Sequence, residues 1–367
     1  MSEDLLYYVA LIFLQGIGPV LARRLVAYMG GAKNVFEADP KLFAKVPGIG
    51  DLTVKEINIK EALQKAEKEL EFMAKNNVKA IAYPDELYPK SLSKFEDSPV
   101  VLFYKGSADF VDFSTSLAVV GTRKATVYGK NVCENLITSL ADNGFKPVII
   151  SGLAYGIDYC AHKSALKSNL VTVSVLGHGL DRVYPAVHKK IASEILDAGG
   201  ALISEYPSST EPDRMLFVRR NRIIAALSDA VIVVESALKG GALITAEYAA
   251  HYRKKVFAVP GRVGDEHSEG CNWLIKNNKA LMIEKAEDLV SQMNWRAKAV
   301  QTKIEFPLMN NDEKKIYDLL SKEEKLSSDV ISYKLGFSVS KVLGLLIQME
   351  LKGIIVSLPG NFYTLNL

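Results

Sequence analysis

The chain has 367 residues, of which 49% are hydrophobic and 24% are charged. This length predicts two or three domains. The composition excludes a largely disordered chain, which would be poorer in apolar residues and richer in charge. The net charge is only +3. Composition alone therefore does not indicate a nucleic-acid partner, and any such prediction has to rest on local motifs.

No uncharged apolar run approaches the ~18 residues that a membrane span requires, so we expect no membrane partner. The longest such run near the amino terminus, Leu5–Leu14, follows two acidic residues and has no basic segment before it, which argues against a signal peptide. The three cysteines are scattered and form neither a disulfide framework nor a CxxC metal pair. A reducing, cytoplasmic location fits this pattern.

Residues 1–82 are predicted to form a small helical domain. Two similar turns, Gln15–Pro19 and Val46–Gly50, each precede a predicted helix, over Val20–Tyr28 and Leu52–Ile57. The turns resemble helix-hairpin-helix motifs, in which glycines let backbone amides approach a phosphate. A tight turn between packed helices is the alternative, and the nearly balanced charge of this segment weakens the case for phosphate contact.

Residues 83–295 alternate apolar runs with helical stretches. The runs are too continuous for strands with one exposed face, so we expect a parallel sheet. Repeated strand–helix–strand units predict a doubly wound α/β domain, whose ligands bind at the carboxyl ends of the strands. The predicted strands are Leu117–Val120, Val148–Ile150, Val171–Leu176, Ala230–Val234 and Val256–Val259, with weaker candidates at Ala201–Ile203 and Ala280–Ile283.

Residues 296–307 are weakly patterned and are interpreted as a linker. Residues 308–367 then offer three helices, expected over Asp312–Leu320, Ser327–Leu335 and Ser340–Lys352, followed by two short apolar segments. This order predicts a winged helix whose third helix would be the recognition helix. Its basic and acidic residues balance, which is unusual for a reader of duplex DNA, so contact with another protein is the alternative.

A glycine-rich loop follows the predicted strand at Leu117–Val120. It carries Gly121, Thr122, Arg123 and Lys124. Amides, hydroxyls and two cations at the carboxyl end of a strand suit a phosphate. The loop matches neither GxGxxG nor the P-loop, and a charged surface loop is the alternative interpretation.

The strand Val148–Ile150 leads into a similar loop, in which Ser151 and Gly152 offer a second phosphate-binding site. Asp158 and His162 follow at a spacing that places them on one helical face. A catalytic interpretation would need Ser151 as the nucleophile, but the Gly-x-Ser-x-Gly turn is missing. We therefore predict an Asp158–His162 pair that anchors the helix.

The densest cationic segment contains Phe217, Arg219, Arg220, Asn221 and Arg222. Arginine binds phosphate through a planar fork, asparagine can hydrogen-bond a base edge, and phenylalanine can stack on a base. This mixture is typical of single-strand binding. Arg219 and Arg222 share a helical face, whereas Arg220 points elsewhere.

One of these three arginines is expected to be structural, paired with an acid such as Glu205 or Glu235. Lys189 and Lys190 supply further cations, either as clamps on a nucleic-acid backbone or as part of a solvated face. A third glycine-rich loop, with Gly240 and Gly241, opens a predicted helix after the strand Ala230–Val234. Three such loops in one sheet indicate one polyanion or one phosphorylated ligand.

These segments resemble the DNA-processing protein A family, DprA, also called Smf. The similarity covers nearly the whole chain, and its motifs follow the family's order. They are VVGTRKATVYGK, SGLAYGIDYCAH, VLGHGLDRVYP, ISEYP, FVRRNRIIAALS, VVES with KGGALITAEYA, and VFAVPG. Two departures are Gly240-Gly241-Ala242, where the family usually has Ser-Gly-Ser, and Val218, where a proline often follows the phenylalanine.

The resemblance implies a Rossmann-like core between a helical domain and a winged helix. It implies a homodimeric, single-stranded-DNA-binding recombination mediator that protects incoming DNA during natural transformation and helps load the RecA recombinase. The residues themselves predict no catalytic residue, metal or cofactor, because the histidines and cysteines lack metal-ligand spacing and no activated nucleophile is evident. Together with the loops above, the resemblance implies DNA contacts from Gly121, Thr122, Arg123, Lys124, Ser151, Gly152, Lys189, Phe217, Arg219, Asn221, Arg222, Gly240 and Gly241.

Two other functions compete with this one. The segment Lys239–Glu247 loosely resembles the Pro-Gly-Gly-x-Gly-Thr-x-x-Glu motif of lysine-decarboxylase-like phosphoribohydrolases, which cleave nucleoside monophosphates. Here Thr245 and Glu247 are one residue too close, and the third glycine is absent. The other alternative is a duplex-specific transcription regulator acting through the winged helix, which the balanced charge of that domain disfavours.

Overall fold

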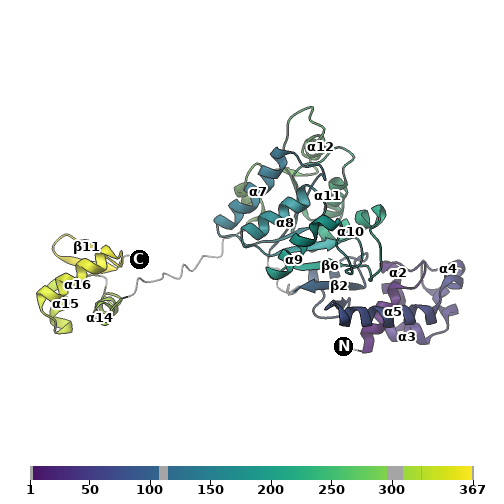
Figure 1. Cartoon of the computed structure of the whole chain (residues 1–367), viewed down its shortest axis with the longest axis horizontal. Coiled ribbons are helices and arrows are strands. Elements are labelled where there is room, and N and C mark those ends of the chain that lie inside the picture. Colours follow the sequence, from purple (N-terminus) through teal and green to yellow (C-terminus); the bar gives the residue numbers. More distant parts are fainter. Residues whose placement is uncertain (1–2, 107–114, 296–308, 324, 366–367) are drawn as a thin grey trace. The chain divides into compact units, whose positions relative to one another are not determined.

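A computed structural model of the chain describes residues 3–106, 115–295, 309–323 and 325–365. The chain divides into two compact units, residues 1–298 and 299–367. Figure 1 shows both units, with the first containing the purple helical segment and the teal and green α/β core. The predicted linker, residues 296–307, lies outside the described residues.

A nine-stranded sheet runs through the first unit in the order β1-β2-β6-β5-β4-β3-β7-β8-β9. Strands from β6 to β9 pair in parallel, whereas β1–β2 and β2–β6 are antiparallel. The chain winds outward in both directions from β3, so the carboxyl ends of β3 and β7 form a switch point. The strands are Lys79–Ala82 (β1), Val101–Gly106 (β2), Ser116–Val120 (β3), Val148–Ser151 (β4), Thr172–Leu176 (β5), Ala201–Ser204 (β6), Ala230–Val233 (β7), Lys255–Ala258 (β8) and Leu281–Met282 (β9).

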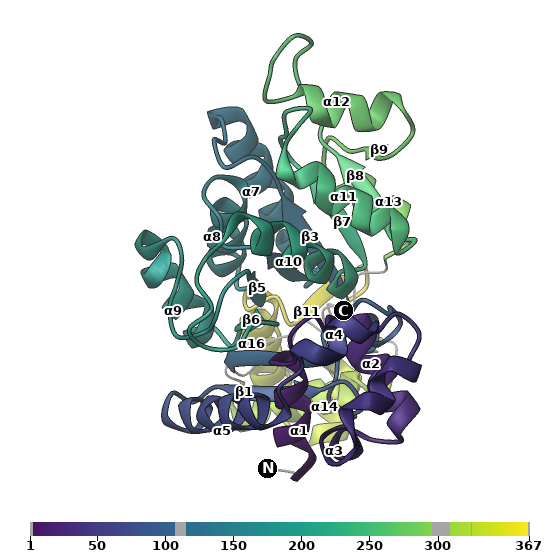
Figure 2. The ribbon, with the colours of Figure 1, turned by 90° about the vertical axis from the view of Figure 1, so that its right-hand side faces the viewer.

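Helices cover both faces of this sheet, as the doubly wound prediction requires (Figure 2). Leu117 and Val119 on β3 pack toward α7, α8 and α13, whereas Ala118 and Val120 pack toward α10 and α11. The alternation follows from the two-residue period of a strand. The helices are Lys90–Ser93 (α6), Val127–Asp142 (α7), Ile157–Lys167 (α8), Ala186–His188 (η2), Lys189–Asp197 (α9), Arg214–Leu227 (α10), Gly241–His251 (α11), Glu269–Lys276 (α12) and Ala286–Met293 (α13).

The predicted helical domain is confirmed, and its two glycine turns pack against each other's helices. Gly16 has φ +74°, and a Cβ there would lie 2.9 Å from Thr53 Cγ2 on α4. Gly48 has φ +94°, and a Cβ there would lie 2.9 Å from Leu21 Cδ2 on α2. Packing therefore accounts for these glycines. The elements are Glu3–Ile12 (α1), Pro19–Met29 (α2), Ala32–Glu37 (α3), Pro40–Lys45 (η1), Asp51–Glu56 (α4) and Ile59–Lys75 (α5).

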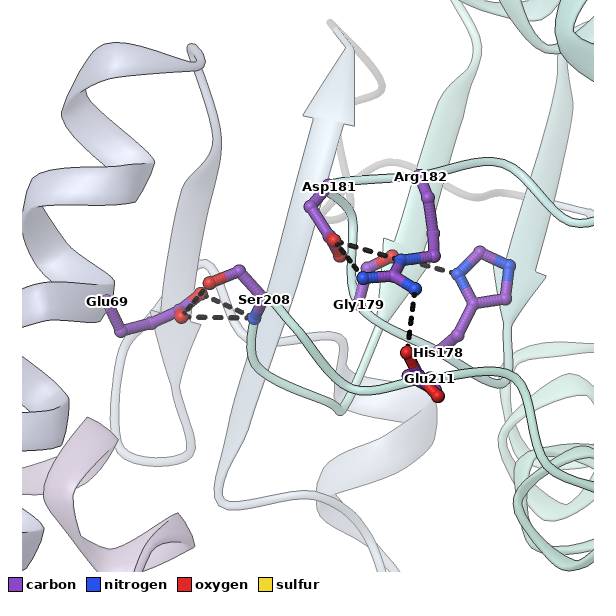
Figure 3. A network of polar contacts seen from close by, with 7 residues as sticks. All are labelled: Glu69, His178, Gly179, Asp181, Arg182, Ser208 and Glu211. Atoms are coloured by element: carbon purple, nitrogen blue, oxygen red, sulfur yellow. Dashed lines mark hydrogen bonds and ion pairs between the residues drawn. The ribbon is translucent and has the colours of Figure 1, made fainter.

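The helical domain ends earlier than the predicted residue 82, because β1 belongs to the central sheet. Its apolar core is continuous with the edge of that sheet, where Val101 and Phe103 of β2 join the cluster. Figure 3 shows a polar contact between the same parts: the Glu69 carboxylate of α5 accepts hydrogen bonds from the backbone N–H of Ser208 at 2.9 and 3.0 Å. Ser208 lies in the loop between β6 and α10, so α5 helps to position that loop.

The second unit is a small winged helix, as predicted. Its core contains Ile316, Ile331, Leu346 and Ile355. The two-residue strand β10 was not predicted, because so short a segment carries no period. The elements are Asn311–Leu320 (α14), Leu326–Ser327 (β10), Ser328–Leu335 (α15), Val339–Leu351 (α16), Ile355–Leu358 (β11) and Phe362–Leu365 (β12), with strand order β10-β12-β11.

Among the described helices, none is by itself long and apolar enough to cross a membrane. In the part of the chain that the structure describes, one pair of helices, α15 and α16, passes the test of length and composition when taken together, and the two are bent by 115° at the break between them.

Candidate functional site

A cavity of about 320 Å³ lies at the switch point between β3 and β7. The loops after these two strands and the first half of α10 surround it. Its lining brings together many of the predicted site residues from distant parts of the sequence. Those residues are Gly121, Thr122, Arg123, Phe217, Asn221, Gly240 and Gly241.

The loop after β3 is held in place by Glu235, which follows β7. The Glu235 carboxylate accepts hydrogen bonds from the backbone N–H of Thr126, at 2.9 Å, and from the Thr126 hydroxyl. The Glu235 carbonyl accepts one from Thr122 N–H at 2.8 Å. Glu235 therefore clamps this loop and does not balance an arginine, which had been one of the two predicted options. The clamp leaves Arg123 and Lys124 exposed to solvent.

Polar groups in the loop after β4 already have hydrogen-bond partners within the protein. This corrects the predictions that Ser151 and Gly152 bind a phosphate. The Ser151 hydroxyl is buried and donates to Val119 O at 2.7 Å. The N–H of Gly152 donates to Asp158 Oδ2 at 3.1 Å. Because both groups already have protein partners, they do not form the open phosphate-binding loop that the sequence indicated.

The predicted Asp158–His162 pair is also wrong. Asp158 accepts from the N–H groups of Gly152 and Ala154, whereas His162 Nδ1 lies 2.7 Å from Thr172 Oγ1. Burial raises the pKa of Asp158, and nearby Arg220 opposes that shift. Burial lowers the pKa of His162 to about 3, so the ring is neutral at physiological pH.

Arg220 lines the cavity, but its buried guanidinium has a structural role. Its Nη1 donates to Gly152 O at 2.8 Å and also to Val175 O. A Cβ on Gly152 would lie 2.4 Å from Arg220 Nη2, so a glycine is required to admit the guanidinium. Burial lowers the pKa of Arg220 to about 10, and Asp158 opposes the shift, so the group stays charged near neutral pH. Arg220 thus joins the loop after β4 to α10.

Arg222 is also structural. Its Nη2 lies 2.5 Å from Glu205 Oε2, and its Nε lies 3.9 Å from Asp97 Oδ2. The predicted partner Glu205 is thus correct, but two of the three arginines, Arg220 and Arg222, are structural instead of one. Arg222 does not line the switch-point cavity, and its guanidinium is engaged by these two acids instead of facing a DNA strand there. Arg219 is exposed, and with Arg222 it lines a separate cavity beside α2.

Phe217 forms part of an aromatic stack with Tyr184, a residue that was not among the predicted DNA contacts. The ring of Tyr184 stacks on Phe217 with centroids 5.6 Å apart and planes 22° apart. The guanidinium carbon of Arg123 lies 5.4 Å from the Phe217 centroid. Tyr184 is 45% exposed, so an edge of the stack faces solvent. Tyr184 lies within the motif VLGHGLDRVYP, but its position 33 residues before Phe217 gave no indication that the two rings would stack.

The loop that carries Tyr184 is linked to the loop before α10. Figure 3 shows Arg182 between two acids: its guanidinium lies 2.8 Å from Asp181 and 3.6 Å from Glu211. These ion pairs are partly exposed and each contributes little to stability. The Arg182–Glu211 pair nevertheless connects the loop that carries Tyr184 to the loop that leads into α10, which carries Phe217.

The third glycine-rich loop begins α11. Gly240 is the N-cap residue, and no side chain caps the helix. A Cβ on Gly240 would lie 2.2 Å from Ser236 Oγ, whereas one on Gly241 would meet nothing within 4 Å. The amino terminus of an uncapped helix offers unpaired N–H groups and a favourable dipole to an anion. Asn221 Nδ2 donates to Gly241 O at 3.4 Å, so α10 contacts this loop.

Lys124 and Lys189 lie apart from the switch-point cavity. Lys189 begins α9 and is exposed, and it is not among the residues that line the cavity. Lys124 lines a larger neighbouring cavity between α7 and α8, which it shares with Arg123. Arg123 therefore stands between the two cavities.

The described residues contain no group of three or more His, Cys, Asp and Glu side chains placed to hold a metal ion. Glu247, the acid of the competing hydrolase motif, lies on α11 and is exposed. It is not among the residues that line the cavity.

Comparison with known proteins agrees with this architecture. A family described as DNA recombination-mediator protein A matches residues 79–294, a DprA winged helix domain matches residues 307–361, and a SAM-like helix-hairpin-helix tandem matches residues 8–65. The chain is 37% identical over 304 residues to protein Smf of Escherichia coli, covering 82% of this chain and 80% of that protein. It is 38% identical over 211 residues to DNA processing protein DprA of Streptococcus pneumoniae, covering 58% and 73%.

Solved structures of two such proteins are also similar. DNA processing protein A of S. pneumoniae superposes with a TM-score of 0.67 at 31% identity, covering 78% of this chain and 97% of that one. DNA processing protein A of Helicobacter pylori, described for its single-stranded DNA binding mode, gives a TM-score of 0.52 at 32% identity, covering 59% and 95%. The motifs, the doubly wound sheet with its two flanking domains and these matches show that the chain belongs to the DNA recombination-mediator protein A family.

Proposed function

We propose that this protein binds single-stranded DNA at the switch-point cavity and acts as a recombination mediator. The observation that carries the proposal is the stack of Arg123, Phe217 and Tyr184 beside the uncapped amino terminus of α11. A cation and helix amides suit phosphates, and an aromatic ring with an exposed neighbour suits an unstacked base. The contacts we propose come from Gly121, Thr122, Arg123, Phe217, Asn221, Gly240 and Gly241 in the cavity, and from Lys124, Arg219 and Lys189 outside it.

The geometry favours a single strand over a duplex. Bases in a duplex are stacked on each other, so an aromatic platform can receive a base only if the strand is unpaired. A cavity of about 320 Å³ is also too small for a double helix. The H. pylori relative, which is described as binding single-stranded DNA, supports the same choice.

The finer parts of the proposal follow from family membership. We infer that the protein works as a cytoplasmic homodimer, protects incoming strands during natural transformation and helps to load the RecA recombinase on them. The test of loading is a strand-exchange assay with RecA and a single-strand-binding protein that blocks it. Addition of this protein should restore exchange, and the Phe217→Ala variant should restore less.

A salt titration tests strand binding directly. The full chain is titrated with single-stranded and blunt duplex oligonucleotides of equal length at several salt concentrations. We expect tighter binding to the single strand, with affinity that falls linearly in a plot of log K against log salt, because bound cations release counterions from the phosphates. Equal affinity for both forms at every salt concentration would contradict the proposal.

The competing hydrolase function is tested with the same protein. Hydrolysis would need an acid or base within hydrogen-bond reach of the scissile bond, and Glu247 is the carboxylate that the loose motif offers. We expect no product from nucleoside monophosphates, with or without magnesium. Product that disappears in the Glu247→Gln variant would favour the enzyme instead.

A further inference from the structure

A second cavity lies between α7 and α8, the two helices that lie side by side on one face of the sheet (Figure 2). Its volume is about 740 Å³, compared with about 320 Å³ for the switch-point cavity. Proteins commonly bind ligands in cavities of about 300–1,000 Å³. The strand contacts proposed above reach this cavity only through Arg123 and Lys124, which leaves the rest of its wall unassigned.

Cations outnumber acids in the wall of this cavity. Lys167 Nζ lies 2.6 Å from Glu134 Oε1, so the charges of these two lining residues cancel. A concave wall with a surplus of positive charge focuses a positive field in the cavity and attracts anions. The surplus comes from four exposed cations, none of which forms an ion pair within the described part of the chain: Arg123 and Lys124 after β3, Lys130 on α7 and Lys163 on α8.

Aromatic rings form another part of the same wall. The ring of Tyr159 stacks on the buried ring of His188 with centroids 4.8 Å apart, and Tyr155 packs edge-on against His188 at 5.1 Å. His188 is itself held by the contact of its Nδ1 with Leu153 O at 2.8 Å. Tyr155 is 47% exposed, so its ring is supported by the protein on one side and open on the other. Cations beside an open ring suit a nucleotide, whose phosphate is anionic and whose base can stack.

A narrow hollow lies between the two cavities. Its volume is about 20 Å³. Arg123 and Phe217 line both the hollow and the switch-point cavity, whereas Arg123 and Tyr155 line both the hollow and the cavity between α7 and α8. The hollow is too small for a nucleotide, so a strand would cross it at the surface, over the exposed parts of Tyr184 and Tyr155. These shared residues mark a continuous route from one cavity to the other.

We propose that a bound single strand continues from the switch-point cavity, past Arg123 and Tyr155, into the cavity between α7 and α8, where Lys130 and Lys163 bind its next phosphates. The ligand of the second cavity is thus a phosphorylated nucleotide within a chain. The inference rests on the proposed function, because it extends the same strand. Continuity with the strand site and the open ring of Tyr155 favour this ligand over an acidic peptide, which needs only the cations.

The length of the strand tests this route. The full chain and its Lys130→Ala/Lys163→Ala variant are titrated at several salt concentrations with oligothymidylates of increasing length, up to about 16 nucleotides, the upper range of single-strand sites. Each lost phosphate contact lowers the salt slope by about 0.7. We expect the variant to lose about 1.4 from its slope on long strands and to bind the shortest strands that the full chain binds with an unchanged slope.

A matched pair of lysines provides the control. Lys146→Ala/Lys255→Ala removes two exposed lysines at the amino ends of β4 and β8, at the opposite edge of the sheet, and should change neither slope. If the Lys130→Ala/Lys163→Ala variant matches the full chain at every length, the route is wrong and strand binding at the switch point stands. An equal loss of slope on short and long strands would also reject the route. If no strand binds the full chain, the proposed function itself fails.

Photo-cross-linking locates the strand directly. Thiothymidine is placed at each position of a long oligothymidylate in turn, and the cross-linked peptides are identified by mass spectrometry. Some positions should cross-link near Phe217 and others near Tyr155 on the loop before α8. Tyr155→Ala should weaken long strands by about fivefold or more, because a stacked base is lost, whereas Tyr155→Phe should bind as the full chain does. Cross-links confined to the Phe217 region at every position would overturn the proposal.

Two other ligands would use the same cations and are tested with the same variants. Thymidine triphosphate should lose any binding that depends on Lys130 and Lys163 once a long strand is saturating. If that binding persists beside the strand, the cavity is a separate nucleotide site and the route is wrong. A polyglutamate peptide should bind more weakly than an oligothymidylate of equal charge. Equal or tighter binding that Lys130→Ala/Lys163→Ala removes would assign the cavity to an acidic protein partner instead.

Discussion

The guanidinium carbon of Arg123 lies 5.4 Å from the centroid of the Phe217 ring. Arg123 lies in the loop after β3 and Phe217 on α10, and the sequence predicts separate roles for the two side chains. Their contact means that the proposed phosphate-binding cation rests on the proposed base-stacking platform. A substitution of either residue should therefore affect the contribution that the other makes to strand binding.

Arg123→Ala and Phe217→Ala should still weaken strand binding in different ways. Loss of the Arg123 cation should reduce the salt slope by about 0.7. Loss of the Phe217 ring should cost about 1–3 kcal/mol of binding free energy and leave the slope nearly unchanged. Lys146→Ala is the control, because this exposed lysine precedes the amino end of β4, at the opposite edge of the sheet. If both variants shift the slope equally, the two roles are wrongly assigned.

The contact between these residues predicts that their effects are not additive. In a double-mutant cycle, the Arg123→Ala/Phe217→Ala protein should lose less affinity than the two single variants together, by about 0.5–1 kcal/mol, the usual strength of an exposed cation–π pair. The same cycle with Lys124→Ala in place of Arg123→Ala should be additive within error. A coupling free energy of zero for the Arg123 cycle would mean that the contact does not persist in solution.

Most of this site could be predicted from the sequence because its loops follow buried strands. The apolar runs mark the strands, and the glycines that follow mark the loops. They failed where a partner comes from far along the chain. The Tyr184–Phe217 stack and the Glu235–Thr126 clamp join residues 33 and 109 positions apart, and neither leaves a local pattern. The predicted Asp158–His162 pair is wrong because a four-residue spacing places two side chains on one helical face but does not determine their hydrogen-bond partners.

Substitution of Arg222 should mainly reduce stability, whereas substitution of Arg219 should mainly reduce strand binding. Arg222→Ala leaves Glu205, whose side chain is 9% exposed, without its cation, and this should lower the free energy of unfolding by about 3–5 kcal/mol. Arg219→Ala removes an exposed cation and should change stability by less than about 0.5 kcal/mol while weakening strand binding. Urea unfolding and a binding titration on both variants measure this. If the Arg222→Ala protein is stable but has lost affinity for the single strand, Arg222 contacts DNA directly.

His162 should make the protein sensitive to acid. Its folded-state pKa of about 3 lies below the ordinary value of 6.5. The neutral ring therefore contributes its full stability above pH 6.5, and this contribution falls as the pH drops toward 3, by up to about 1.4 kcal/mol per pH unit. His162→Asn should flatten the plot of unfolding free energy against pH in that range, and His251→Asn, on the surface, should not. His178, whose pKa burial also lowers, should account for part of the remaining slope.

The winged helix should contribute little to strand binding. The exposed side of its third helix, α16, presents Val339, Leu343, Ile347 and Leu351 at four-residue intervals, which places them in one apolar row. A recognition helix that binds DNA needs cations or polar groups that face the phosphates and the base edges. Deletion from Ala297 onward should thus leave single-strand affinity within a factor of ten, about 1.4 kcal/mol, and the salt slope unchanged. Leu343→Lys in the full chain tests the same surface. If α16 faces DNA, the added cation should raise both the single-strand affinity and the salt slope. We expect neither quantity to change. A larger loss on deletion, or a gain in the lysine variant, would show that this domain contacts the strand.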